Sequence, residues 1–470
     1  MSLADQPTVQ TNLPTFAGIF PLPLTIFEIF MLVDARVGYP MMCDLELHFQ
    51  GSIDRAAFDS GLAFAMARNP LFRSLVIDHG PKQLAWQLTD RLPLVDWAPA
   101  GTPRGARYDK TIDLRVDIGL RVWVRHDIDR STVLFHFHHA CADGMGGFAF
   151  IEDFLVGYAA AFPQSAPVEA RPLEPQRLNH RQDFGIDQRS FWRTVGDSLL
   201  GVREFVKFFA EAPRPLPTMT PHVEGHTVAR SAGFLSQPLS EEVTSGLRCA
   251  AGNAGATLND LLLRDLLIAM RDWSRAAGDD PGQRRLRILV PQNLRQREDR
   301  GMPAANVMGF AFITRRANMC DHGDQLLTSI RDETELLRRY RLSLFFLGGI
   351  AAAQSTGMFP WMMRRTFCFS TSVLTNLGDP TRRFVARLPR SGAGLVVGNL
   401  VFEQITGGPP VRPLTKAAFS IFNSARNLSI SLKCDPHCYS SLDTQRLLGQ
   451  YVAQLRSTGE RALAARAPGG

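Results

Sequence analysis

The sequence predicts a mixed α/β protein built from two domains. Its 470 residues exceed what one hydrophobic core normally supports, and 45% of them are hydrophobic, which is enough for two cores. Both halves of the chain mix strand-like and helical stretches. The segment 212–221 has four prolines in ten residues, which prevents a regular helix or central strand. We therefore expect an N-terminal domain over residues 1–211, a proline-rich linker over 212–225 and a C-terminal domain over 226–470.

The first half begins with a strand and a helix. Alternation of apolar and polar residues over 45–49 predicts the strand, and Asp54 is an N-cap candidate for the helix. The buried face of that helix is expected to carry four apolar residues, Phe58, Leu62, Ala65 and Met66. Further on, an apolar alternating stretch over 131–137 precedes a helical pattern over 147–162.

The second half repeats this mixture. Residues 256–273 form an amphipathic helical pattern, and 286–290 form a strand candidate. A late strand is expected over 428–435. No short-period repeat is visible, so a solenoid or propeller is not expected.

The junction between the strand 131–137 and the helix 147–162 carries a short motif. It reads His138-His139-Ala140-Cys141-Ala142-Asp143-Gly144, an H-H-x-x-x-D-G pattern. This pattern resembles the active-site motif of the CoA-dependent acyltransferase superfamily, which includes chloramphenicol acetyltransferase, BAHD acyltransferases, peptide-synthetase condensation domains, polyketide-associated acyltransferases and wax-ester synthases. The resemblance implies two chloramphenicol acetyltransferase-like α/β sandwich subdomains with a channel between them.

Transfer of an acyl group from a thioester requires a base that removes the acceptor's proton, and a neutral imidazole suits neutral pH. We assign His139 as this base and Asp143 as the organiser of the loop. Gly144 permits backbone conformations closed to other residues, and His138 should point to the opposite strand face. Both are placed with the substrate-binding residues. The structural alternative is that the histidines end a core strand and Asp143 caps the next helix.

Two arginines are candidates for an ion pair with Asp143. Arg68 begins a segment similar to the R-H-x-x-L-R element of condensation domains, with Asn69 in place of histidine, and it is the first choice. Arg295 ends a P-x-x-L-R element and is the second. Asn306 follows in a segment that resembles G-N-x-x-G, with Ala305 where the first glycine usually stands, and we place Asn306 with the substrate-binding residues.

Other segments extend the resemblance over most of the chain. Residues 23–30, with an acidic Glu28, and 256–263 look like parts of wax-ester synthases. The segment 370–378 resembles a T-N-x-x-G element that runs beside the catalytic channel, and Ser372 and Asn376 are its candidates for stabilising an oxyanion. The chain has no D-F-G-W-G sequence, which argues against a BAHD enzyme and a typical condensation domain.

The resemblance implies an O-acyltransferase that makes an ester. The co-substrate would be acyl-CoA or the phosphopantetheine thioester of an acyl carrier protein, and the acceptor a small-molecule or lipid alcohol. No bound cofactor is expected, and no metal, since the lone C-x-x-H-C segment with Cys434, His437 and Cys438 lacks a second ligand pair. Two alternatives stay open: a condensation-type amide synthase, and a non-catalytic member of the fold that binds a carrier protein.

Composition restricts the remaining partners. The net charge of +7 is mild and the arginines are dispersed, which argues against nucleic acid. Seven irregularly spaced cysteines indicate free thiols, and neither a signal pattern nor an apolar run of about 18 residues is present, so we expect a soluble cytoplasmic protein. An apolar stripe over 191–209 could contact a membrane surface, cover an apolar substrate channel or pack within the protein.

Overall fold

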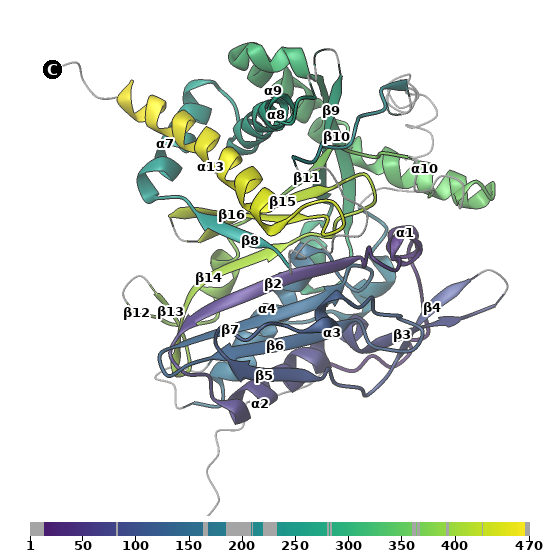
Figure 1. Cartoon of the computed structure of the whole chain (residues 1–470). Coiled ribbons are helices and arrows are strands. Elements are labelled where there is room, and N and C mark those ends of the chain that lie inside the picture. Colours follow the sequence, from purple (N-terminus) through teal and green to yellow (C-terminus); the bar gives the residue numbers. More distant parts are fainter. Residues whose placement is uncertain are drawn as a thin grey trace, which may run out of the picture. The chain divides into compact units, whose positions relative to one another are not determined.

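Figure 1 shows the computed structural model of the chain. It describes residues 14–80, 83–162, 168–184, 208, 210–219, 233–279, 282, 284–359, 363, 367–391, 394–424 and 426–465. The chain forms two compact units. Unit 1 comprises Met1–Gly185, Asn293–Met308 and Asp379–Thr406, and unit 2 comprises Ile186–Gln292, Gly309–Gly378 and Gly407–Gly470.

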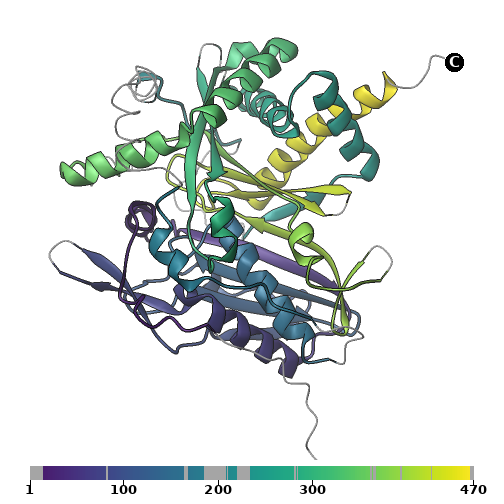
Figure 2. The ribbon, with the colours of Figure 1, turned by 180° about the vertical axis from the view of Figure 1, so that it is seen from behind.

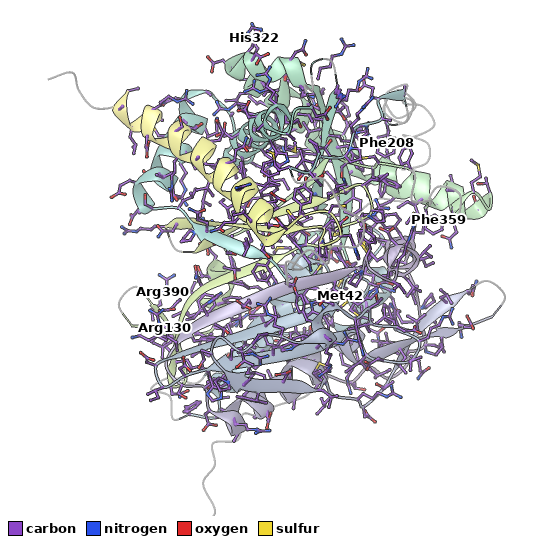
Figure 3. The ribbon with its side chains drawn as sticks, viewed as in Figure 1. Met42, Arg130, Phe208, His322, Phe359 and Arg390 are labelled. Carbon is purple, nitrogen blue, oxygen red and sulfur yellow. The ribbon has the colours of Figure 1, made fainter. Side chains whose placement is uncertain are left out.

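Unit 1 is built on a seven-stranded sheet in the described residues, with strand order β12-β13-β14-β2-β7-β6-β5. The strands are β2 (Met42–Gln50), β5 (Val95–Pro99), β6 (Leu120–His126), β7 (Arg130–His138), β12 (Arg390–Ser391), β13 (Gly394–Val397) and β14 (Leu400–Gly408). The central strands β2 and β7 pair antiparallel, with Met42 opposite His138 and Gln50 opposite Arg130. Met42 and Arg130, labelled in Figure 3, therefore mark the two ends of this ladder.

The helices of unit 1 are α1 (Ile26–Asp34), α2 (Arg55–Arg68), α3 (Ala106–Asp109), α4 (Gly144–Ala159) and α12 (Thr381–Phe384). Helix α2 begins as predicted, because the Asp54 carboxylate accepts the backbone N–H of Ala57 at 2.8 Å. Helices α2 and α4 lie side by side on one face of the sheet (Figure 2). Their close approach depends on Gly61, where a Cβ would stand 2.8 Å from the backbone nitrogen of Tyr158. A small three-stranded sheet has the order β1 (Leu22–Pro23), β4 (Leu84–Leu88) and β3 (Ser74–Asp78).

The buried acidic residue of helix α1 is part of the framework of unit 1. The Glu28 carboxylate accepts two hydrogen bonds from Arg181, at 2.8 and 2.7 Å, and one from Nε1 of Trp86 at 3.1 Å. It also closes a capping box with Thr25 at the start of the helix. Glu28 therefore joins three segments that are far apart in the sequence.

Unit 2 contains a six-stranded sheet in the described residues, with strand order β10-β9-β11-β15-β16-β8. Its strands are β8 (Leu235–Pro238), β9 (Arg285–Asn293), β10 (Met308–Arg316), β11 (Ser372–Gly378), β15 (Ala417–Ser424) and β16 (Asn427–Cys434). Its helices are α7 (Glu241–Asn253), α8 (Leu258–Ala276), α9 (Gly323–Arg339), α10 (Ser343–Ser355) and α13 (Ser441–Ala464). The predicted strands over 286–290 and 428–435 and the predicted helix over 256–273 correspond to β9, β16 and α8.

The division of the chain differs from the predicted one in two ways. Residues 293–308 and 379–406 belong to unit 1, although they lie in the second half of the sequence. Strands β13 and β14 extend the sheet of unit 1 next to β2, and this long-range pairing leaves no mark in local composition. The prediction of two continuous domains is therefore wrong for these segments.

The proline-rich segment also packs more than a linker would. The Pro217 carbonyl accepts hydrogen bonds from Trp273 and Tyr439, both at 2.8 Å, and Leu216 is buried in the core of unit 2. Residues 220–225 of the predicted linker lie outside the described residues, as does the segment 191–209 of the predicted apolar stripe except for residue 208.

In the described ranges, no helix combines the length and the apolar character needed to cross a bilayer.

Candidate active site

Strand β7 delivers His139 to the start of a tight loop in unit 1. The backbone N–H of His139 donates to the Met41 carbonyl at 2.7 Å, which fixes the residue just beyond the strand end. Its Nδ1 lies 3.1 Å from the carbonyl oxygen of Ala142. A carbonyl can only accept, so Nδ1 carries the proton of the neutral ring and Nε2 keeps its lone pair. The loop thus selects the tautomer in which Nε2 is the basic atom.

The surroundings keep this imidazole neutral. The His139 residue is 8% exposed, and burial lowers its pKa below the usual value of 6.5. Contacts with backbone carbonyls and the charge of Asp143 oppose this shift without cancelling it. The ring also meets the Phe27 ring of helix α1 edge to face, with 5.9 Å between centroids. At neutral pH the site therefore holds an uncharged base.

Asp143 contacts the loop and its neighbours through both carboxylate oxygens. Oδ1 accepts the N–H of Gly146 at 2.8 Å, which makes Asp143 the N-cap of helix α4. Oδ2 accepts Nη1 of Arg295 at 2.8 Å and the N–H of Val307 at 2.9 Å. Burial alone raises the pKa of Asp143, but Arg295 and the hydrogen bonds outweigh burial and hold it below its usual value. The carboxylate is thus occupied by the scaffold, while Nδ1 of His139 is held by a carbonyl.

The arginine that pairs with Asp143 is the second choice from the sequence. The first choice, Arg68, is wrong: its Nε donates instead to Asp153 at 2.8 Å, and its Nη2 to the Arg171 carbonyl. The reason is the alignment of α2 with α4, which brings the end of α2 beside Asp153, in the middle of α4 and away from the loop.

Asn69, which stands where the resemblance has a histidine, connects three segments. Its side-chain amide donates to Asp153 at 2.8 Å and to the Ala65 carbonyl at 2.9 Å. Its side-chain carbonyl accepts the N–H of Ala304 at 2.8 Å. Sequence reasoning gave Asn69 no role, yet it links α2 and α4 to the segment that carries Asn306.

Asn306 holds the backbone of the histidine loop. Its Nδ2 donates to the carbonyl oxygens of His139 and Ala140, both at 2.8 Å. These contacts support the loop, whereas the predicted contact of Asn306 with substrate stays a prediction.

The glycines in and just after the motif have a different structural role from the one predicted. Gly144 is not among the residues with positive φ, so the expected need for special backbone conformations there is wrong. Close packing instead requires Gly146 and Gly147. A Cβ on Gly146 would stand 2.6 Å from the Ala305 carbonyl oxygen, and one on Gly147 2.6 Å from Cδ1 of Leu45. The Met-Gly-Gly sequence directly after the motif is the feature from which this close packing could have been predicted.

His138 is fully buried and shares a strand face with His136, two residues earlier. Its Nδ1 accepts the N–H of Ala140 at 3.1 Å. Burial lowers the pKa of His138 to about 3, so the ring is neutral at physiological pH. His136 bonds Asp44 at 2.7 Å, which places His138 on the face that carries this buried polar pair.

Cys141 is suited to packing rather than to nucleophilic attack. The residue is completely buried, and burial raises the pKa of its thiol well above the usual value. A thiol that stays protonated is a poor nucleophile.

The two oxyanion candidates lie in unit 2, whereas His139 lies in unit 1. Ser372 is buried and donates its hydroxyl to the Ala417 carbonyl at 2.9 Å. Asn376 is exposed, and its Nδ2 has a long contact of 3.4 Å with Asn259. Asn259 belongs to the predicted 256–263 segment, so the structure brings these two sequence elements together within unit 2.

Solved structures with a similar fold cover almost the whole chain. The first condensation domain of the calcium-dependent antibiotic synthetase, in complex with a substrate analogue, matches with a TM-score of 0.64 and 13% identity over 93% of this chain and 95% of that one. The epimerization domain from the third module of tyrocidine synthetase B matches with a TM-score of 0.62 and 16% identity over 94% and 98%. The SgcC5 protein from Streptomyces globisporus matches with a TM-score of 0.59 and 14% identity over 93% and 99%.

Curated relatives match a smaller part of the chain. An uncharacterized protein of Mycobacterium tuberculosis is 25% identical over 267 residues, which is 53% of this chain and 57% of the relative. The match therefore spans little more than half of that relative's length. Surfactin synthase subunit 2 of Bacillus subtilis is 27% identical over 146 residues, 31% of this chain and 4% of that protein. No family model matches the chain.

These likenesses establish the architecture. The likeness to wax-ester synthases stays a prediction. The chain has the two-subdomain, chloramphenicol acetyltransferase-like α/β fold that condensation and epimerization domains share.

Proposed function

We propose that this protein transfers an acyl group from a thioester to a hydroxyl acceptor, with His139 as the general base. The observation that carries the proposal is the neutral His139 ring, whose Nδ1 proton is directed to the Ala142 carbonyl. This arrangement leaves Nε2 able to accept a proton at neutral pH. The condensation-domain fold supports an acyl-transfer reaction as the general class.

The proposed step balances with the groups named. Nε2 of His139 removes the proton of the acceptor hydroxyl as its oxygen attacks the thioester carbonyl carbon. The resulting tetrahedral oxyanion collapses, the carbon–sulfur bond breaks, and the imidazolium returns its proton to the departing thiolate. The products are an ester and a free thiol, and the neutral base is regenerated. A well-placed base of this kind contributes about 10²–10⁴ in rate.

The ion pair of Asp143 with Arg295 would serve this step by holding the loop. It fixes the start of α4, and Asn306 fixes the carbonyls of His139 and Ala140. Two donors to the oxyanion were expected from the sequence, and within unit 2 the Ser372 hydroxyl is bonded to a strand carbonyl at 2.9 Å, whereas Nδ2 of Asn376 has a long contact of 3.4 Å with Asn259. One such donor contributes about 10²–10³ in rate.

An amide-forming condensation is the second candidate. It is favoured by the match to surfactin synthase and by the fold shared with condensation domains of peptide synthetases. The same neutral base would then accept a proton from an amine. In either reaction we propose acyl-CoA or a carrier-protein phosphopantetheine thioester as the acyl donor.

The test is turnover of the purified protein with acyl-CoAs and acylated carrier protein, each offered an alcohol or an amine acceptor. Release of free thiol measures transfer, and mass spectrometry of the product distinguishes an ester from an amide. We expect thiol release that depends on acceptor and is lost in His139→Ala. Acceptor-dependent turnover that persists in that variant would contradict the proposed base, and carrier-protein binding without any turnover would favour the non-catalytic alternative.

A further inference from the structure

Helix α10 of unit 2 has no charged residue and is apolar around its circumference. Its sequence, SLFFLGGIAAAQS, has Leu344, Leu347 and Ile350 buried on one side. Much of the remaining surface is partly or fully exposed, including Phe345 and Ala352. A helix that is apolar all round is normally enclosed by a protein core or by lipid. Within the part of the chain that the structure describes, the outer side of α10 therefore lacks the apolar cover that its composition predicts.

The inner side of α10 packs on unit 2. The Phe346 ring packs on Phe310 and Phe312, with centroids 5.3 and 5.4 Å apart. From this anchor, α10 extends away from the six-stranded sheet of unit 2, as the two opposite views show (Figures 1 and 2). The exposed side therefore does not pack on that sheet.

The segments that flank α10 add apolar surface. Leu336 and Tyr340, at the end of α9, are 49% and 50% exposed, and Met358, just beyond α10, is 53% exposed. These are three of the ten large hydrophobic residues exposed in the described part of the chain. Three exposed large hydrophobic residues thus flank α10 within 23 residues of sequence, and exposed apolar surface of this kind is typical of interaction sites.

The same surface carries positive charge at one end. Arg338 and Arg339 are exposed in the last turn of α9, and no carboxylate pairs with either of them in the described residues. Arg339 lies over the Tyr340 ring at 5.7 Å. An apolar helix beside unpaired arginines and an exposed tyrosine matches the requirements of the boundary between water and an anionic bilayer.

We propose that the surface formed by residues 336–358 docks on an anionic membrane. Helix α10 lies in the plane of the interface, with its exposed apolar side among the acyl chains and Arg338 and Arg339 on the lipid phosphates. Its 13 residues span about 20 Å, too short to cross a bilayer. The arginines and the absence of charge on α10 together favour lipid over an acidic protein. The carboxylates of an acidic protein would find no opposite charge along α10. This inference is independent of the proposed reaction.

The experiment is flotation of the full-length protein with vesicles of phosphatidylcholine alone or mixed with phosphatidylglycerol. We expect binding to the mixed vesicles that falls with increasing salt. Arg338→Gln with Arg339→Gln should lower the partition coefficient about tenfold or more. Leu336→Asp with Met358→Asp should lower it as well, and both residues are exposed enough for the fold to tolerate the change.

Matched controls change the same residue types elsewhere. Ile128→Asp replaces a residue that is 91% exposed in unit 1, and Arg382→Gln with Arg426→Gln removes two exposed charges; neither should alter vesicle binding. Binding equal to that of the controls in both test variants would overturn the proposal. So would a dimer in sedimentation velocity that Leu336→Asp dissociates while the wild-type protein binds no vesicles, since a second copy would then cover the surface.

Discussion

Each unit contains an arginine that is largely removed from water, and the two are stabilised differently. In unit 1, Arg295 donates to the Asp143 carboxylate at 2.8 Å. In unit 2, Arg287 is 1% exposed and donates to the Thr314 hydroxyl at 2.9 Å and to backbone carbonyls, among them that of Glu211 at 2.9 Å. The Arg287 guanidinium also lies 4.5 Å from the centroid of the Phe208 ring, which Figure 3 labels.

The two environments have different electrostatic consequences. Burial lowers the pKa of Arg287 to about 10, because the partners of its guanidinium among the described residues are neutral oxygens and more distant negative charge offsets little of that burial. At the pair in unit 1 the carboxylate is the affected group, and Arg295 helps to hold the pKa of Asp143 below its usual value. Removing one partner of an ion pair leaves the other charge unpaired, which is costly. A guanidinium held by dipoles and aromatic faces instead has its stabilisation divided among several groups. The paired arginine is the one beside the candidate base.

The largest expected effect is the loss of turnover when His139, the proposed base, is replaced, and it does not involve either arginine. His139→Ala should lower turnover by about 10²–10⁴ while the thermal midpoint stays near that of the wild type, because the ring is the base and is not part of an ion pair. Steady-state kinetics and thermal unfolding of the same samples measure both. His138→Ala, the matched control, should lose less activity, and equal losses in the two variants would refute the assignment of His139.

Removal of the carboxylate should affect both fold and activity. Asp143→Ala leaves Arg295 without its partner beside α4, which should destabilise the protein by about 3–5 kcal/mol and lower activity at the same time. Denaturant unfolding measures the stability. In Asp143→Ala with Arg295→Met no unpaired charge remains, so part of the stability should return. A double variant no more stable than the single one would show that the pair is not coupled.

A smaller effect is expected at Arg287, where no carboxylate would be left unpaired. Arg287→Met deprives the hydroxyl and carbonyl acceptors of a donor, which should cost about 1–3 kcal/mol of unfolding free energy. Denaturant unfolding, together with turnover of the folded variant, tests this. A loss as large as that of Asp143→Ala would contradict the distinction between the two arginines.

The smallest effect is a displacement along the pH axis. Because the pKa of His139 is below 6.5 in the folded protein, activity should persist as pH falls below 6.5 and decline only at the folded pKa. As the pH decreases, histidine is protonated in the unfolded chain before it is protonated in the folded protein. The free energy of unfolding should therefore decrease once the pH drops below 6.5, and the lowered pKa of His138 adds to this decrease. The contribution of Asp143 to the free energy of unfolding also decreases at low pH, but it is lost only as the pH falls through the lowered pKa of Asp143. An activity profile whose acid limb lies above pH 6.5 would contradict the neutral site.

Local pattern was sufficient for much of the secondary structure around the site. The alternation over 131–137 and the Asp54 cap correspond to β7 and to the start of α2, because strand periodicity and capping depend on adjacent residues. The motif also placed His139 at a strand end and Asp143 at a helix start. Local pattern could not decide whether Arg68 or Arg295 pairs with Asp143, since both arginines stand in segments that resemble motifs of the family.

The sequence by itself determined the mixed α/β class, the histidine loop and the ends of its flanking elements, all of which follow from contacts within a few residues. Only the tertiary structure decided that residues 293–308 pack on the loop and that β13 and β14 extend the sheet of unit 1. It also decided the tautomer of His139 and the partners of Asp143, Arg68 and Asn69. These features depend on groups as many as 235 residues apart in the chain, and which of them meet is set by the packing of whole helices and strands, not by local pattern.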